Sequence, residues 1–197
     1  MKIGLLGGSF NPIHNGHLAI AETVKKKLRL DKIWFLPSGK HPFKRNNEFL
    51  PPSLRYQLVQ TAIKNYSDFE VHDFDFHHSG GYSYTDELIK RIKDKFPEDI
   101  FYFIIGADLV PELSKWHNFQ WLLKNVKFVV VNRPDADKSK FIDLDYVSRL
   151  RFVKMKPVDI SSTDIRDRLF FGNSISGLVP PEVEKKLLAF METEQER

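Results

Sequence analysis

Two histidines that lie three residues apart, His14 and His17, stand in the stretch GGSFNPIHNGH at residues 7–17. The stretch also holds three glycines and a proline, and it separates an apolar run from a pattern typical of an amphipathic helix. Glycines permit a close backbone approach, and the free N–H groups of a helix start lie at the positive end of the helix dipole. Two imidazoles add further donors, so the stretch indicates a site for a phosphate group.

Other interpretations of this stretch fit less well. No Gly-Lys-Ser/Thr follows, as a Walker A loop requires, and the glycine spacing is not that of a dinucleotide-binding GxGxxG motif. A His-x-x-His pair supplies only two zinc ligands, and the nearby candidates His41, His77 and Asp108 lack metal-ligand spacing. Two polar histidines in an ordinary turn would leave the glycines and the proline unexplained. We therefore predict no metal-ligating residue here.

The segment VDISSTDIRDRL at residues 158–169 also leads from a short polar turn into a helix start. Ser161 and Asp164 have the spacing of a capping box, which predicts a helix that begins at about Ser162. Thr163 then lies in the first turn, and Arg166 lies one turn further along the same side. The spacing predicts a second anion site, and the alternative is a capped helix with a surface arginine.

Strands and helices alternate around these two stretches. Apolar runs predict strands at residues 2–7, 32–37, 69–76, 99–106, 125–134 and 150–155. Apolar residues at helical spacing predict helices that begin near Gly16, Pro52, Ser83, Ser162 and Pro181. Asp86 stands at capping-box distance from Ser83. This order predicts an α/β fold, a Rossmann-like parallel sheet with helices on both faces and its ligand sites beyond the carboxyl ends of the strands.

Length and composition fit a single domain of 197 residues. No apolar run is long enough to cross a membrane, and we see no signal peptide. The absence of cysteine excludes disulfides and thiol nucleophiles and fits a cytoplasmic enzyme. The net charge of +4 suits small polyanionic substrates. It also leaves open a nucleic-acid-binding module, although no finger, RNP-like or basic-arm pattern is present.

The motifs GGSFNPIHNGHL and ISSTDIR together resemble the HxGH nucleotidylyltransferase superfamily, and the full pattern is similar to the bacterial nicotinate-nucleotide adenylyltransferases. Further matches are LPSGKHPFK, Arg55, YSYTDEL, FIIGADLVPELSKW and VNRP, so the resemblance covers nearly the whole chain. One loop departs from the pattern, because this family usually has Pro-His-Lys where the chain has Pro42-Phe43-Lys44.

The resemblance implies one nucleotidylyltransferase domain over residues 1–197, in which the ISSTDIR helix and the C-terminal helix complete the ATP site. It implies that ATP and nicotinate mononucleotide react, with Mg²⁺, to give deamido-NAD and pyrophosphate in NAD biosynthesis. The mononucleotide phosphate would attack the α-phosphorus in line, without a covalent enzyme intermediate. No nucleic acid or membrane is implied as a partner, and a homo-oligomer stays open.

The resemblance also implies roles for individual residues. It assigns catalysis to His14, His17 and Arg166. It assigns ATP binding to Gly8, Ser9, Phe10, Gly16, Lys44, Gly106, Asp108, Ser162 and Thr163. It assigns nicotinate mononucleotide binding to Thr85, Trp116 and Arg133, and it assigns no metal ligand.

Two further functions remain as alternatives. One is a sister enzyme, a nicotinamide-mononucleotide or phosphopantetheine adenylyltransferase, although the latter typically has threonine where His14 stands. The other is a nucleotide-binding regulator that has lost catalysis, against which the intact His14, His17 and Arg166 argue. An assay of pyrophosphate release with several mononucleotides separates these functions.

Overall fold

The computed structural model of the chain describes residues 1–39, 50–76, 84–132, 141 and 143–195. Within these residues six strands form one sheet in the order β3-β2-β1-β4-β5-β6, and all neighbouring strands are parallel. The strands are β1 (Lys2–Gly8), β2 (Lys32–Pro37), β3 (Phe69–Val71), β4 (Ile100–Gly106), β5 (Lys127–Asn132) and β6 (Arg151–Lys154). This order confirms the predicted fold class, and it places the change of winding direction between β1 and β4.

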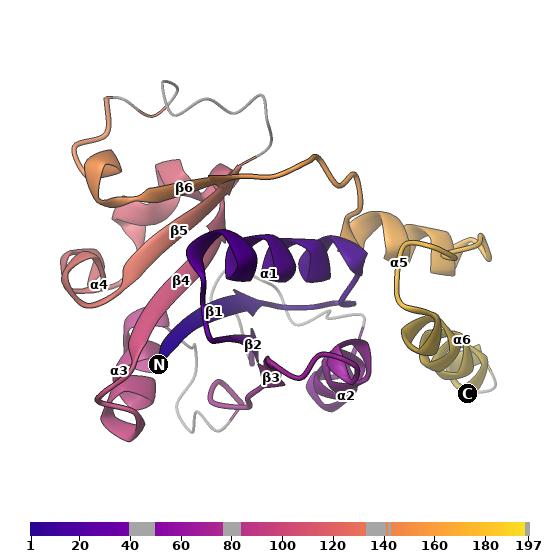
Figure 1. Cartoon of the computed structure of the whole chain (residues 1–197). Coiled ribbons are helices and arrows are strands. Elements are labelled where there is room, and N and C mark those ends of the chain that lie inside the picture. The colour runs from indigo at the N-terminus through magenta and orange to yellow at the C-terminus, as the bar shows by residue number, and fades with distance from the viewer. Residues whose placement is uncertain (40–49, 77–83, 133–140, 142, 196–197) are drawn as a thin grey trace.

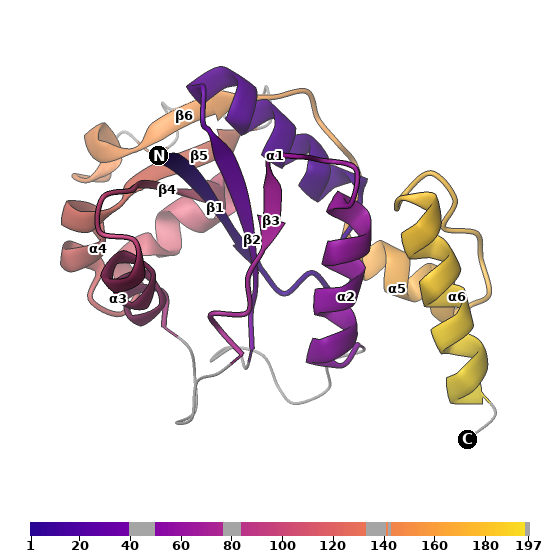
Figure 2. The ribbon, with the colours of Figure 1, turned by 60° about the horizontal axis from the view of Figure 1, so that its bottom comes forward.

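Helices cover both faces of the sheet (Figures 1 and 2). One layer contains α1 (Asn15–Leu28) and α2 (Pro52–Ile63), and α5 (Ser162–Phe170) and α6 (Pro181–Gln195) extend it beside α2. The opposite layer contains α3 (Thr85–Lys95), the 3₁₀ helix η1 (Ala107–Lys115) and α4 (Phe119–Asn125), and a short 3₁₀ helix η3 (Val147–Arg149) precedes β6. None of the described helices combines the length and the apolar character that a membrane span requires.

Alternating side chains of the central strands feed two separate apolar cores. In β4, Phe101, Phe103 and Ile105 pack against the layer of α3 and α4. Tyr102 and Ile104 pack against the layer of α1 and α2. Because both faces are covered, the strand is apolar at nearly every position, which is why its sequence is a continuous apolar run.

The predicted strand over residues 69–76 is shorter in the structure. Only Phe69–Val71 pairs with β2, and the backbone N–H of Phe76 donates to the carbonyl of Asp73 in a turn. The alternating pattern of this segment therefore extends past the point where pairing stops. Among the described residues β3 is the edge strand of the sheet, so β2 is its only neighbour and no second strand holds residues 72–76 in an extended ladder.

Two differences concern the layer of α3 and α4. The helix expected from Ser83 begins at Thr85, with Tyr84 as its N-cap and without a side-chain capping bond, and Ser83 lies outside the described residues. Residues 107–124 carry no predicted element, and the structure places η1 and α4 over residues 107–125, so α4 includes Asn125 of the predicted strand. Both are short, and Pro111 interrupts the ordinary helical pattern of η1.

A buried arginine connects the loops that follow β1 and β2. Arg55 of α2 is completely buried and donates through Nη1 to the carbonyls of Ser9 (2.6 Å) and Ser38 (2.8 Å). It continues the stripe on which Leu58 and Val59 are also buried. A charged group on an apolar stripe is costly unless it is paired, so its place in the pattern was a signal of this buried role.

Candidate active site

The first helix start is built around two stacked histidines. His14 is the N-cap of α1 and has an extended backbone, and His17 lies in the first turn. The ring centroids are 3.7 Å apart with an interplanar angle of 30°. The backbone N–H of His14 donates to Nδ1 of His17 (3.2 Å), so the neutral His17 ring carries its proton on Nε2. His17 therefore offers one N–H donor of defined position.

Both histidines are neutral at physiological pH. Burial lowers the pKa of His14 from its usual 6.5 to about 4. Burial, and after it the adjacent His14, lowers the pKa of His17 well below its usual range. Two stacked imidazolium rings would repel each other, so the pair acts as hydrogen-bond donors before any anion arrives.

Two close approaches shape the loop around the histidines. A Cβ at Gly16 would lie 2.9 Å from Nδ1 of His14, so only glycine leaves room for the ring. Phe10 is buried, packs edge to face on His17 at 5.0 Å and has a positive φ of 44°. An aromatic residue rarely adopts that backbone conformation, and such strain is commonly kept at functional sites.

The second predicted helix start docks directly on this loop. Ser162 Oγ donates to the carbonyl of Pro12 (2.9 Å), and Arg166 Nη1 donates to the carbonyl of Asn11 (2.9 Å). Arg166 Nη2 also donates to Thr163 Oγ1 (3.2 Å). Five N–H donors make up a guanidinium, so Arg166 keeps further donors for an anion. The two predicted anion sites thus lie together.

Capping explains why α5 begins where it does. The Ser161 side chain accepts a hydrogen bond from the backbone N–H of Asp164 (3.1 Å), as the sequence predicted. The start of α1 is held in a different way, because Asn15 donates to the carbonyls of Gly177 and Leu178. The sequence analysis missed Asn15, and contacts over such a separation leave no local signal.

A third part of the candidate site lies at the end of β4. Gly106 ends this strand next to β1, and Asp108 follows in η1 with an exposed carboxylate. A Cβ at Gly106 would lie 2.3 Å from Oδ1 of Asp108, so a side chain at position 106 would displace this carboxylate. Gly8 ends the neighbouring strand β1. The predicted residues of β1 and β4 therefore share one edge of the sheet.

The predicted mononucleotide residues lie in the layer of α3 and α4. Thr85 is the first residue of α3, and Trp116 follows η1. Trp116 is half-buried and packs edge to face on Phe103 (6.1 Å) and Phe128 (6.3 Å). Two further predicted residues lie outside the described residues, Lys44 and Arg133.

Among the residues that the structure describes, no three histidine, aspartate or glutamate side chains gather closely enough to hold a metal ion. The part of the candidate site around the two helix starts is instead a set of neutral and cationic donors. Such a set suits the oxygens of a polyphosphate.

Residues 5–168 match the cytidylyltransferase-like family, so the protein is a nucleotidyltransferase in class. A relative from Exiguobacterium sibiricum named "Probable nicotinate-nucleotide adenylyltransferase" is 40% identical over 185 residues, which cover 94% of this chain and 95% of the relative. A relative of the same name from Clostridium acetobutylicum is 37% identical over 188 residues, covering 92% and 94%. The chain belongs to the bacterial nicotinate-nucleotide adenylyltransferases.

Solved structures agree with this fold. The Plasmodium falciparum nicotinic acid mononucleotide adenylyltransferase complexed with NaAD superposes with a TM-score of 0.76 at 21% identity, covering 96% of this chain and 95% of that one. The same protein complexed with APC gives a TM-score of 0.73 at 20% identity, with the same coverage.

The histidine pair predicts an acid-sensitive fold. The folded pKa of His14 lies near 4 and the usual value is 6.5, so between these pH values the unfolded chain binds more protons. The contribution of His14 to the free energy of unfolding is therefore fully present above about pH 6.5 and is lost as the pH falls towards 4. From pH 7 to about 4.5, His14 alone should lower the free energy of unfolding by about 2 kcal/mol. Urea unfolding at both pH values, on wild type and His14→Asn, measures this loss. Equal losses in the two proteins would contradict it.

Proposed function

We propose that the protein joins the adenylyl group of ATP to nicotinate mononucleotide, which gives deamido-NAD and pyrophosphate. The docking of α5 on the loop after β1 carries this proposal, because it joins two phosphate-type helix starts into one site. That site has the donors for a polyphosphate, and the closely related proteins from two bacteria are named for this activity. The site lies beyond the carboxyl ends of the strands, where open parallel sheets bind their ligands.

The chemistry is an in-line substitution at the α-phosphorus of ATP. A phosphate oxygen of the mononucleotide forms the new bond to this phosphorus, and the bond to the bridging oxygen of the β-phosphate breaks. Pyrophosphate leaves with the electron pair of that bond. The metal enters as part of the MgATP substrate. The protein contributes orientation and stabilisation of the developing negative charge.

His17 binds the α-phosphate, where charge develops, through the N–H that its hydrogen bond from His14 leaves on Nε2. His14 contacts the triphosphate, and Gly8, Ser9, Phe10 and Gly16 shape the loop that receives it. A neutral donor binds an oxyanion without the cost of holding two like charges together in the empty site.

The start of α5 holds the β- and γ-phosphates, which become pyrophosphate. Arg166 supplies charge-assisted hydrogen bonds, and Thr163 and Ser162 supply backbone N–H groups at the helix N-terminus. The Ser162 hydroxyl proton is engaged by the Pro12 carbonyl, so this side chain mainly docks the helix. Lys44 adds charge. α6 packs against α2, shares an apolar core with α5, and completes the ATP site within the same single domain.

The remaining assignments divide the two nucleosides. Gly106 and Asp108 hold the ATP ribose, because the Asp108 carboxylate after β4 accepts hydrogen bonds from the ribose hydroxyls. Thr85 at the start of α3 holds the nicotinate carboxylate, Trp116 lies against the pyridine ring, and Arg133 pairs with the mononucleotide phosphate.

The substrate preference tests the function. A nicotinate carboxylate accepts hydrogen bonds at a helix N-terminus, whereas the amide substrate would turn an NH₂ donor towards donors. We expect kcat/KM for the acid mononucleotide to exceed that for the amide by about two to four decades, or about 3–5 kcal/mol. Pyrophosphate release at saturating MgATP measures both values. Equal values, or a preference for the amide, would favour the nicotinamide-mononucleotide alternative.

Loss of His17 should affect the transition state rather than substrate binding. His17→Ala is expected to lower kcat by roughly 10² or more, while the KM values change little. Steady-state kinetics and a circular dichroism spectrum of the folded variant check this. A folded variant with kcat within about threefold of wild type would exclude the role.

Arg166→Ala should lower the binding affinity for MgATP and for pyrophosphate together by roughly tenfold or more, because both ligands lose the same charge-assisted bonds. Binding of nicotinate mononucleotide should stay unchanged. Calorimetric titration with each ligand separates these effects, and Arg168→Ala, on the same helix but paired with Asp164, is the matched control. Unchanged pyrophosphate affinity in Arg166→Ala would mean that this arginine only docks α5.

A further inference from the structure

A buried carboxylate, that of Asp86, connects the two segments that carry Thr85 and Trp116, the residues proposed to bind the nicotinate ring. Asp86 is in the first turn of α3, next to Thr85, and its side chain is completely buried. Carboxylates are almost never fully buried unless they are paired. The position at a helix N-terminus favours the negative charge but does not explain the burial.

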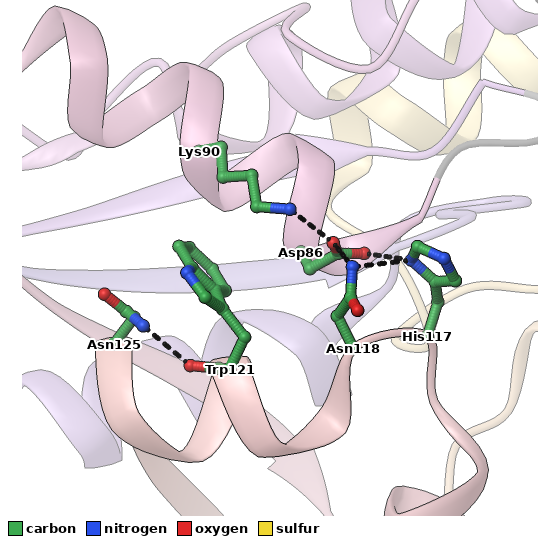
Figure 3. A network of polar contacts seen from close by, with 6 residues as sticks. All are labelled: Asp86, Lys90, His117, Asn118, Trp121 and Asn125. Atoms are coloured by element: carbon green, nitrogen blue, oxygen red, sulfur yellow. Dashed lines mark hydrogen bonds and ion pairs between the residues drawn. The ribbon is translucent and has the colours of Figure 1, made fainter.

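Asp86 accepts hydrogen bonds from three side chains (Figure 3). Its Oδ2 lies 2.8 Å from Nζ of Lys90 and 2.7 Å from Nδ2 of Asn118, and its Oδ1 lies 2.8 Å from Nδ1 of His117. Lys90 comes from the same helix, whereas His117 and Asn118 come from the chain that leads into α4. The carboxylate therefore bridges two elements that are separated by about 30 residues in the sequence.

The bridged segment directly follows Trp116. Asn118 has a left-handed backbone (φ 50°, ψ 37°) and is the N-cap of α4, so the chain changes direction there. His117 also stacks on Tyr84, the N-cap of α3, with ring centroids 4.6 Å apart. The Trp116 ring packs on Phe103 and Phe128, and the next two residues of the chain, His117 and Asn118, are bound to Asp86.

We propose that Asp86 is a positioning residue of the mononucleotide site, which holds Thr85 and Trp116 at the separation that the nicotinate ring requires. This inference rests on the proposed function, because it assigns the ring to these two residues. Asp86 does not touch the substrate and acts through His117 and Asn118.

The charge balance of the cluster is consistent with this role. Burial raises the pKa of Asp86, but hydrogen bonds from Asn118, Lys90 and His117 outweigh it and lower the pKa to about 2. The group is therefore an anion whenever the enzyme works, and His117 Nδ1 must carry the proton that it donates. Lys90, which also lies 4.9 Å from the Trp121 ring centroid, offsets a charge that would otherwise repel the nicotinate carboxylate.

Three variants test the proposal in the full-length protein. Asp86→Ala removes every bond of the bridge. Asn118→Gly removes one bond and keeps the left-handed backbone, which glycine adopts freely. Asp86→Asn is close in shape and can still accept from Lys90 and Asn118 while donating to a neutral His117.

We expect Asp86→Ala to raise KM for nicotinate mononucleotide roughly tenfold or more, and Asn118→Gly to raise it less. KM for MgATP and kcat at saturation should stay within about threefold of wild type, and Asp86→Asn should restore KM for the mononucleotide to within about threefold. Calorimetric titration with the mononucleotide should give the same ranking without turnover.

Glu70→Ala is the matched control, because Glu70 also pairs with a lysine and a histidine, Lys32 and His72, but on β3. An unchanged mononucleotide KM in Asp86→Ala and Asn118→Gly would overturn the proposal. So would equal losses for both substrates, or a loss in Glu70→Ala of the same kind. A wild-type protein without activity on nicotinate mononucleotide would instead overturn the proposed function.

Discussion

Three carbonyl oxygens in the loop after β1 accept hydrogen bonds from side chains that are far away in the sequence. Arg55 binds the carbonyl of Ser9, Arg166 binds that of Asn11, and Ser162 binds that of Pro12. A loop outside the sheet must satisfy its peptide groups elsewhere, and unsatisfied buried carbonyls are costly. These bonds turn the carbonyls towards protein donors, so the negative ends of these peptide dipoles are occupied where a polyanion is expected.

The same bonds assemble the site from distant parts of the chain. Ser162 and Arg166 hold the loop, so the position of α5 depends on the loop between β1 and α1. In Figure 1, α5 lies beside the first turn of α1, whereas the two helices are more than a hundred residues apart in sequence. Docking by side chain to backbone bonds is specific in direction, so it fixes the relative positions of the two helix starts more closely than apolar packing alone would.

Much of the fold, including the helix starts that form the proposed polyphosphate side, could be predicted from local sequence. The cap of α5 by Ser161 and the start of α2 at Pro52 have local causes, and both are found. The end of β3 at Val71 and the short helices of residues 107–125 could not be predicted, because pairing and packing decide them. Asp86 shows the limit most clearly, since its capping-box spacing was a local pattern, whereas two of its three partners, His117 and Asn118, come from another part of the chain.

This contrast separates the two halves of the proposed reaction. A phosphate needs N–H donors and positive charge, and a helix start supplies these within a few residues, so sequence spacing reveals it. A nicotinate ring needs a flat face and a carboxylate partner at a fixed separation, and in the proposed site these are Trp116 and Thr85, on different elements. Their separation depends on a buried carboxylate and on the left-handed turn at Asn118. In the proposed site, discrimination between acid and amide substrates depends on tertiary contacts, whereas the donors for the phosphates depend on local helix starts.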